Sequence, residues 1–122
     1  AWILCEEKSQ YEQALKLAQR GLDKEPDYLD LIDTRGVIYY RLTKYDKAVE
    51  DFQKCIKLYR TSDRGLVGSY FHLARALNHL NRKREAMQNL NQALKLNETL
   101  RGLSETDLEE AKQLEKQLST GA

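Results

Sequence analysis

Apolar residues recur every three or four positions along almost the whole chain of 122 residues, with polar residues between them. This spacing places apolar side chains on one face of a helix, whereas a strand would need strict alternation. Pro26 is the only proline, so little interrupts the pattern. Periodicity and capping residues together predict seven helices and no strands. The expected helices span residues 1–8, 11–24, 27–42, 45–59, 64–80, 83–97 and 104–119.

The pattern also repeats along the chain. Similar residues surround Ala14, Ala48 and Ala86, which are separated by 34 and then 38 residues. Five positions before these alanines stand residues that commonly cap helices, namely Ser9, Thr43 and Asn81. We therefore expect a tight turn and a helix N-cap at each of them. The extra residues of the second interval are expected within 59–66, where the sequence has turn chemistry.

Small residues mark a second feature of the repeat. Gly36 and Ala74 stand twelve positions before Ala48 and Ala86, where a small side chain lets two paired helices approach closely. Each unit is therefore predicted to be helix, tight turn, helix. After the third unit, the segment from Gly102 to Asp107 predicts a stop followed by a capping box that begins a last helix.

These spacings resemble the tetratricopeptide repeat family, whose unit has a small residue and a tyrosine in its first helix and Ala-x-x-x-Phe in its second. Gly36, Tyr39, Ala48 and Phe52 match that pattern. The resemblance covers about residues 1–98. It implies an all-α fold, a right-handed superhelix of about three helical hairpins with a C-terminal capping helix.

On this basis residues 1–122 are expected to form a single domain. Its parts are a truncated first repeat at 1–28, a second at 29–62, a third at 63–98 and a capping helix at 104–119. Trp2 stands where the other repeats have Gly36 and Ala74, and the residues that should precede it are missing. The run also resembles segments inside long bacterial proteins of this family, so we expect a fragment of a larger protein.

Composition argues against several other classes of protein. The chain has 20 basic and 19 acidic residues, for a net charge of +1, which provides no broad field for nucleic acid. It has no apolar run long enough to cross a membrane, and its mean hydropathy is −0.71. We expect a soluble chain, cytoplasmic by default, although the sequence does not indicate a compartment. The basic cluster at 82–84 lacks interleaved aromatic residues and is expected to be a solvated turn, with contact to phosphate or to an acidic partner as the alternative.

Candidate chemistry is equally sparse. His72 and His79 lie two helical turns apart, too far to ligate one metal ion, and Cys5 and Cys55 occupy apolar positions typical of buried thiols. Gly65 and Gly68 lack the residues of a nucleotide-binding loop. We therefore expect no cofactor, no metal and no enzymatic activity.

The resemblance implies instead that the first helices line a concave groove that holds a peptide or a protein segment. The groove candidates are Asp30, Asp33, Val37, Tyr40, Arg41, Phe71, Arg75, Asn78 and His79. We expect Val37, Tyr40 and Phe71 to anchor apolar groups, and Arg41 and Arg75 to pair with acids. One group of family members clamps the C-terminal carboxylate of chaperones, but Ile3, Thr34, Gly68 and His72 stand at the clamp positions here, so we expect a different ligand.

Two alternatives remain open at this point. The segment could be a structural spacer of a longer solenoid, with nothing bound in this groove. Independently, a truncated first repeat would leave Trp2, Ile3 and Leu4 uncovered, which predicts self-association through that edge.

Overall fold

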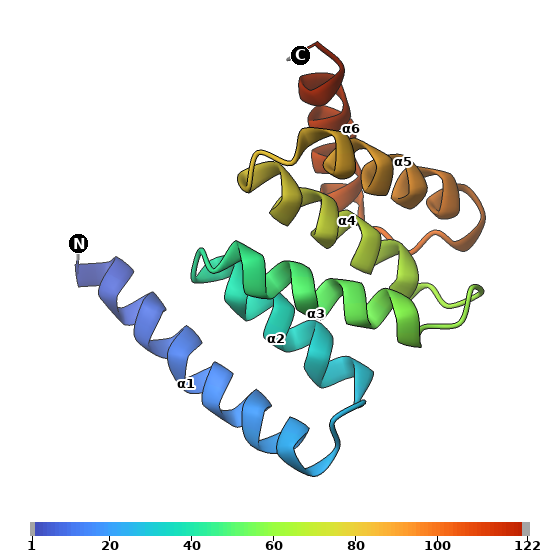
Figure 1. The fold of residues 1–122 in the computed structure, drawn as a ribbon. Coiled ribbons are helices and arrows are strands. Elements are labelled where there is room, and N and C mark those ends of the chain that lie inside the picture. Colours follow the sequence, from blue (N-terminus) through green and yellow to red (C-terminus); the bar gives the residue numbers. More distant parts are fainter. Residues whose placement is uncertain (1, 121–122) are drawn as a thin grey trace.

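The computed structural model describes residues 2–120, with side chains from Glu6 onward. It contains six helices, and the described residues include no strand, which confirms the all-α class (Figure 1). Their bounds are α1 Trp2–Lys24, α2 Leu29–Arg41, α3 Tyr45–Leu58, α4 Gly65–His79, α5 Lys83–Leu100 and α6 Glu105–Thr120. Each helix packs chiefly against its neighbours in sequence, which is the arrangement of a helical repeat superhelix.

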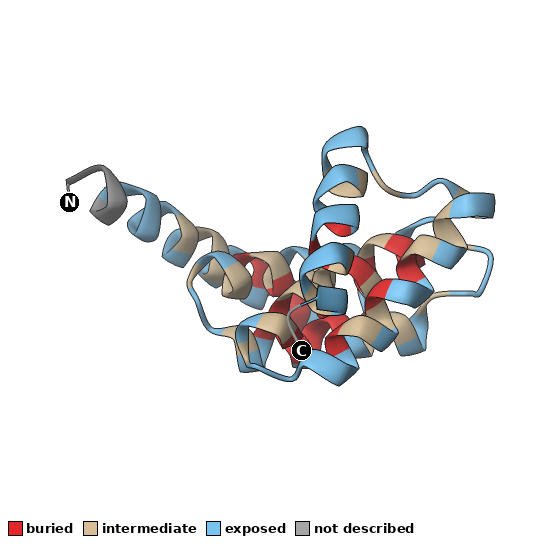
Figure 2. Cartoon of the chain, turned by 90° about the horizontal axis from the view of Figure 1, so that it is seen from above, coloured by how far each residue is buried: buried red, intermediate tan, exposed pale blue. Residues whose placement is uncertain are grey.

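The buried core follows the helix–helix contacts (Figure 2). Ala48 and Ala86 are fully buried, and a Cβ on Gly36 would lie only 2.7 Å from Cε1 of Phe52. The small residues therefore stand where two helices approach most closely, as the repeat predicts. By contrast, residues 6–10 of α1 are all exposed.

An ion pair that the sequence did not suggest links the first three helices. Arg35 of α2 donates hydrogen bonds from Nε and Nη2 to the two carboxylate oxygens of Asp51 on α3, at 2.9 and 2.7 Å. Its Nη1 donates to Oε1 of Gln19 on α1 at 2.8 Å. Asp51 is buried, so this two-pronged contact satisfies a charge that would otherwise be costly to bury.

The prediction of two helices before residue 25 is wrong. Residues 1–8 and 11–24 were expected to be separated by a turn at Ser9, but α1 runs through this position without a break. No glycine or proline interrupts residues 6–13. A separate helix of only eight residues would also be marginally stable, because starting a helix is costly and a short one forms few hydrogen bonds. The side chains of Trp2, Ile3, Leu4 and Cys5 lie outside the described residues.

The N-cap assignments of Thr43 and Asn81 are also wrong. Both have positive φ angles, 61° and 62°, and each ends the preceding helix in a left-handed conformation. After α2, Lys44 N–H donates to Tyr39 O and Thr43 N–H to Tyr40 O, the paired bonds of a Schellman motif. The same two bonds follow α4, from Arg82 to Leu77 and from Asn81 to Asn78. The turns are where predicted, but the residues act as C-terminal rather than N-terminal caps.

The last helix agrees with the predicted capping signal. Ser104 Oγ accepts the N–H of Asp107 at 3.1 Å, and α6 begins at the next residue, Glu105. Its buried residues Ala111 and Leu114 pack in one cluster with Phe71 and Leu90. The loop between α3 and α4 likewise falls at the predicted site of the extra residues.

Candidate functional site

Two hollows lie on the face formed by α2, α4, α6 and the loop that precedes α6. The larger, which we call the Asp33 hollow, has a volume of about 500 Å³. It is lined by Asp33, Tyr59, Arg64, Gly65, Gly68, His72 and residues 101–104. The smaller, which we call the Arg75 hollow, has a volume of about 190 Å³. It is lined by Tyr40, Arg75, Asn78, His79, Glu110, Gln113, Leu114 and Gln117.

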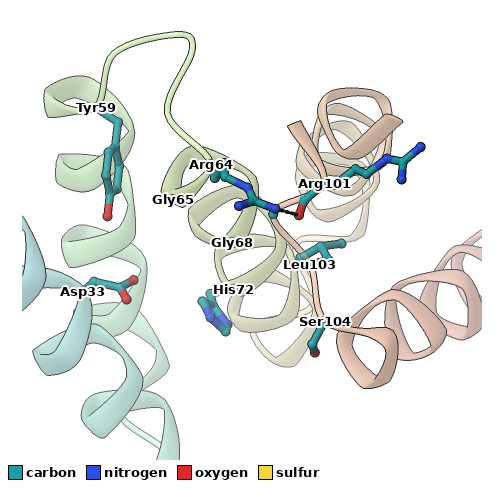
Figure 3. Close-up of a pocket in the computed structure, with 10 residues that line it drawn as sticks. Asp33, Tyr59, Arg64, Gly65, Gly68, His72, Arg101, Leu103 and Ser104 are labelled. Carbon is teal, nitrogen blue, oxygen red and sulfur yellow. Dashed lines mark hydrogen bonds between the residues drawn. The ribbon is translucent and has the colours of Figure 1, made fainter. Parts of the chain in front are cut away.

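The Asp33 hollow is shaped by α4 and the loop that follows α5 (Figure 3). Arg64 donates from Nε to Leu100 O at 3.0 Å and from Nη2 to Arg101 O at 3.1 Å, which ties this loop to the start of α4. A Cβ on Gly102 would lie 2.4 Å from Arg64 O, so only glycine allows this close approach. Gly68 is different, because a Cβ there would meet no atom within 4 Å. The wall of the hollow at Gly68 is therefore open.

Burial and neighbouring charges shift the pKa values of three groups in the Asp33 hollow toward their uncharged forms. Burial, and then the nearby Asp30 carboxylate, raise the pKa of Asp33. Burial also raises the pKa of Tyr59, and Asp33 adds to that shift. Burial, followed by the positive charge of Arg75, lowers the pKa of His72 to about 4. His72 is therefore uncharged at neutral pH and does not act as a cation in the hollow.

The Arg75 hollow is built around an arginine held by aromatic rings. The guanidinium carbon of Arg75 lies 4.7 Å from the ring centroid of Tyr40 and 4.7 Å from that of Phe71. Nη1 pairs with Glu110 of α6 at 3.2 Å, and Nη2 lies 2.7 Å from Nδ1 of His72. Because arginine can only donate, Nδ1 of His72 accepts this bond and the ring hydrogen sits on Nε2.

Tyr40 is the second organising residue of this hollow. Its hydroxyl lies within hydrogen-bond distance, 3.1 Å, of His79 Nε2. Tyr45 stacks on the same histidine with ring centroids 4.3 Å apart. Tyr40 is half-buried, and burial raises the pKa of its hydroxyl. Neighbouring side chains thus hold Tyr40 in place while part of it remains exposed.

The structure brings together five of the nine groove candidates. Asp33 lines the first hollow, and Tyr40, Arg75, Asn78 and His79 line the second. Asp30 is exposed, and Val37 is half-buried against a core cluster formed by residues of α3, α4 and α5. Arg41 lies elsewhere, in a third hollow of about 230 Å³ with Glu7, Lys8, Tyr11, Leu42 and Thr43.

Phe71 is not a groove residue. Its exposed fraction is 0%, and it packs with Ala74, Leu90 and Ala111 in the core between α4, α5 and α6. The expectation that Phe71 anchors an apolar group of a partner is therefore wrong. Docking of α6 against α4 and α5 covers the ring, a contact that the pattern of α4 alone does not reveal.

Sequence reasoning also missed part of the lining. Tyr59, Arg64 and residues 101–104 complete the Asp33 hollow, and four residues of α6 complete the Arg75 hollow. The sequence identified α6 as a cap for the end of the stack, which gave no reason to place its polar residues beside α2. The turn signal from Gly102 to Ser104 marked the loop but not its contact with Arg64.

The described residues contain no group of three or more histidine, cysteine or acidic residues able to hold a metal ion. Cys55 is buried as predicted, and burial, with a further contribution from Asp33, raises its pKa to about 12, so its thiol stays protonated. Within residues 2–120, no helix has the length and apolar character required to cross a membrane.

Solved structures with the same architecture include domains that bind peptides. The complex named TPR2B-domain:pHsp70-complex of yeast Sti1 matches with a TM-score of 0.76 and 21% identity, over 95% of this chain and 88% of that one. The first TPR of Spaghetti (RPAP3), bound to the HSP90 peptide SRMEEVD, matches with a TM-score of 0.73 and 21% identity, over 98% and 93%. The first TPR domain of human RPAP3 gives 0.72 and 21%, over 98% and 92%. At this identity the likeness establishes the fold.

Sequence comparison adds the family. A curated relative, the UDP-N-acetylglucosamine--peptide N-acetylglucosaminyltransferase of Giardia intestinalis (strain ATCC 50803 / WB clone C6), is 33% identical over 66 residues. This match covers 54% of the chain but only 4% of the transferase. The family profile described as tetratricopeptide repeat matches residues 27–99, more than half of the chain. Together with the stacked hairpins and their small residues at the helix contacts, this match shows that the chain belongs to the tetratricopeptide repeat family.

Proposed function

We propose that this chain is a protein-binding module that holds a peptide or protein segment against the face formed by α2, α4 and α6. The observation that carries the proposal is the presence of two neighbouring hollows on this one face, each lined by polar and aromatic side chains. Binding sites for extended segments combine such recesses with polar groups that fix orientation.

The structural neighbours support the general mode of action. Yeast Sti1 and Spaghetti are seen with pHsp70 and with an HSP90 peptide, respectively, on the same fold. We expect the details of recognition to differ here, because the family resemblance places Ile3, Thr34, Gly68 and His72 at the positions of the carboxylate clamp of chaperone-binding members. A non-catalytic role is consistent with the family and with the protonated state of Cys55.

Tyr40 is the best candidate for an anchoring residue. It is half-buried and is held by Arg75, His79 and Tyr45, so little of its side-chain freedom would be lost on binding. Asn78 lines the same hollow and can donate to a carbonyl or acidic group of the partner, whereas Arg75 is already bound to Glu110 and His72. Val37 contributes through packing that supports this face rather than through a wide exposed surface.

The test is a selection from a library of random twelve-residue peptides, followed by titration of labelled binders. We expect Tyr40→Ala to weaken binding by about tenfold or more, as loss of an aromatic anchor does. Gln53→Ala is the control, because Gln53 is exposed and belongs to a hollow formed by α3, α4 and α5 instead. Circular dichroism establishes that each variant is folded.

The opposite results would decide against this function. Peptides whose affinity is unchanged by Tyr40→Ala but reduced by Gln53→Ala would indicate that the binding site is the hollow formed by α3, α4 and α5. A library without any binder would favour the spacer role.

We also propose self-association at the edge of α1 as a secondary property. Leu17 is 65% exposed, a large apolar group on the same helix as the residues expected to be uncovered. Sedimentation equilibrium should show a concentration-dependent dimer that Leu17→Gln weakens. A monomer at all concentrations would remove this property without affecting peptide binding.

A further inference from the structure

We propose that the Asp33 hollow holds a lysine or arginine side chain of the bound segment, with the Asp33 carboxylate as its ion-pair partner. This inference rests on the proposed function and names the chemistry of the partner at one point of the same face. It predicts a partner whose binding segment carries a basic residue.

The first argument is that Asp33 has no partner of its own. Among residues 6–120, neither a hydrogen bond nor an ion pair reaches its carboxylate, although the side chain is partly buried. Asp51, a buried acid on α3, is by contrast bound by Arg35 through both oxygens. The fold thus neutralises the carboxylate it needs for packing and leaves Asp33 unpaired in a hollow.

The second argument is that every nearby cation is already engaged or directed elsewhere. Arg64 donates to the carbonyl oxygens of Leu100 and Arg101. His72 is neutral and accepts a bond from Arg75, which is itself paired with Glu110. Figure 3 shows the guanidinium of Arg101 pointing away from Asp33. None of these described cations pairs with Asp33, which leaves its carboxylate available to a cation of the bound segment.

The third argument is that the surroundings of Asp33 suit a positive group. Asp30 and Asp63 both add negative potential around the Tyr59 hydroxyl, which lies on the same side of the hollow as Asp33. The Tyr59 oxygen can accept a bond from an ammonium or guanidinium group. An acidic side chain placed here would instead be repelled by Asp33 and Asp30.

The fourth argument concerns space. The hollow measures about 500 Å³, which admits a long side chain, and its wall at Gly68 is open. A leucine at position 68 would project a bulky group from α4 into this opening. An alanine would add only one carbon, which contacts nothing. Gly68→Leu should therefore block the hollow, whereas Gly68→Ala changes the helix residue without filling the hollow.

The decisive experiment uses three small probes of similar length. The N-acetyl N-methylamides of lysine, norleucine and glutamate are titrated into the ¹⁵N-labelled chain, and the amide signals of Gly65, Gly68 and Gly102 are followed by NMR. We expect saturable shifts with the lysine probe, and shifts at least fivefold weaker with norleucine and glutamate. Equal responses to lysine and norleucine, a stronger response to glutamate, or no saturable response to lysine would overturn the proposal.

Matched variants assign the effect to the hollow. Asp33→Asn and Gly68→Leu should abolish the lysine response, whereas Asp30→Asn, which removes the same charge from an exposed position, and Gly68→Ala should largely preserve it. Circular dichroism verifies the fold of each variant. A lysine response that is unchanged in Asp33→Asn, or lost equally in Asp30→Asn, would contradict the assignment to Asp33.

The titration also separates this inference from the proposed function. Peptides selected from the library that lack basic residues, and that bind equally well to Asp33→Asn, would overturn the inference and leave the binding function standing. A library without binders would overturn the binding function, and the lysine titration would still decide on the hollow.

Discussion

The two hollows lie on one face of the molecule, yet their charged groups are used in opposite ways. In the Arg75 hollow, Arg75 lies between two aromatic rings, pairs with Glu110 and bonds to His72. In the Asp33 hollow, the carboxylate has no described partner. The comparison teaches that two residues on the same face can differ in their availability to a partner. A charged group that is already bound within the chain supports the structure, whereas one without a partner in the chain remains available for binding.

Loss of the Phe71 ring should have the largest effect on stability, because this buried side chain packs beneath the Arg75 hollow. We expect Phe71→Ala to lower the free energy of unfolding by about 3–5 kcal/mol. Chemical denaturation measures the change, and Leu17→Ala, at a 65% exposed position, serves as a control with a small effect. A change below about 1 kcal/mol would mean that Phe71 is not a core residue.

The second-largest effect on stability should come from lowering the pH, which protonates His72. The pKa of His72 is about 4 in the folded chain, compared with an ordinary value of 6.5. Burial is the main cause of this decrease, Arg75 and Arg41 add to it, and Asp107 opposes it. The unfolded chain therefore binds the proton more readily, and stability falls as the pH is lowered from 6.5 to 4. The loss attributable to His72 is about 3 kcal/mol.

Denaturation curves across this pH range check the His72 prediction. The His72→Gln variant should lack this component of the pH dependence, while other titrating groups remain. Identical pH profiles for the two chains would show that His72 is not buried as a neutral ring.

A substitution at Gly68, in the open wall of the Asp33 hollow, should have a smaller effect and should increase stability. Gly68→Ala should raise the free energy of unfolding by about 0.5–1 kcal/mol, since alanine favours a helix more than glycine does and its Cβ meets no atom here. Gly36→Ala is the matched contrast, because its Cβ would lie 2.7 Å from the Phe52 ring and should destabilise the chain. Destabilisation by both would show that Gly68 is not at an open wall.

The smallest effect should come from Asp33 itself. Its pKa is raised in the folded chain by burial and by Asp30, so at pH 7 the charged form is disfavoured by folding. Asp33→Asn should therefore stabilise the chain slightly at pH 7, and this advantage should disappear as the pH falls and the carboxyl of the parent chain becomes protonated. A variant that is less stable at pH 7 would indicate that Asp33 has a stabilising partner.

The fold could be predicted from the sequence wherever a local feature, such as a capping residue or a small side chain, is compatible with only one structure. Ser104 caps α6, and Gly36, Ala48 and Ala86 stand at close helix contacts, because small size and capping chemistry act over a few ångströms. Thr43 and Asn81 marked real turns, but capping chemistry does not distinguish the end of one helix from the start of the next. Ser9 carried the same signal and yet lies within α1.

The candidate site was less predictable, because it depends on contacts between distant parts of the chain. Asp33, Tyr40 and Arg75 were assigned to one face from repeat positions, and they line its hollows. The burial of Phe71, the carbonyl contacts of Arg64 and the pairing of Arg75 with Glu110 all require the docking of α6 or its preceding loop. No periodicity within a single helix contains that information.

The sequence by itself determined the helical class, the repeat and the small residues at its contacts, since these follow from apolar spacing and side-chain size along the chain. Only the tertiary structure decided which polar groups are satisfied. It covered Phe71, neutralised His72 and left Asp33 without a described partner. The physical reason is that burial and pairing are properties of neighbours in space, and for Asp33 and Arg75 those neighbours come from three or more separate segments of the chain.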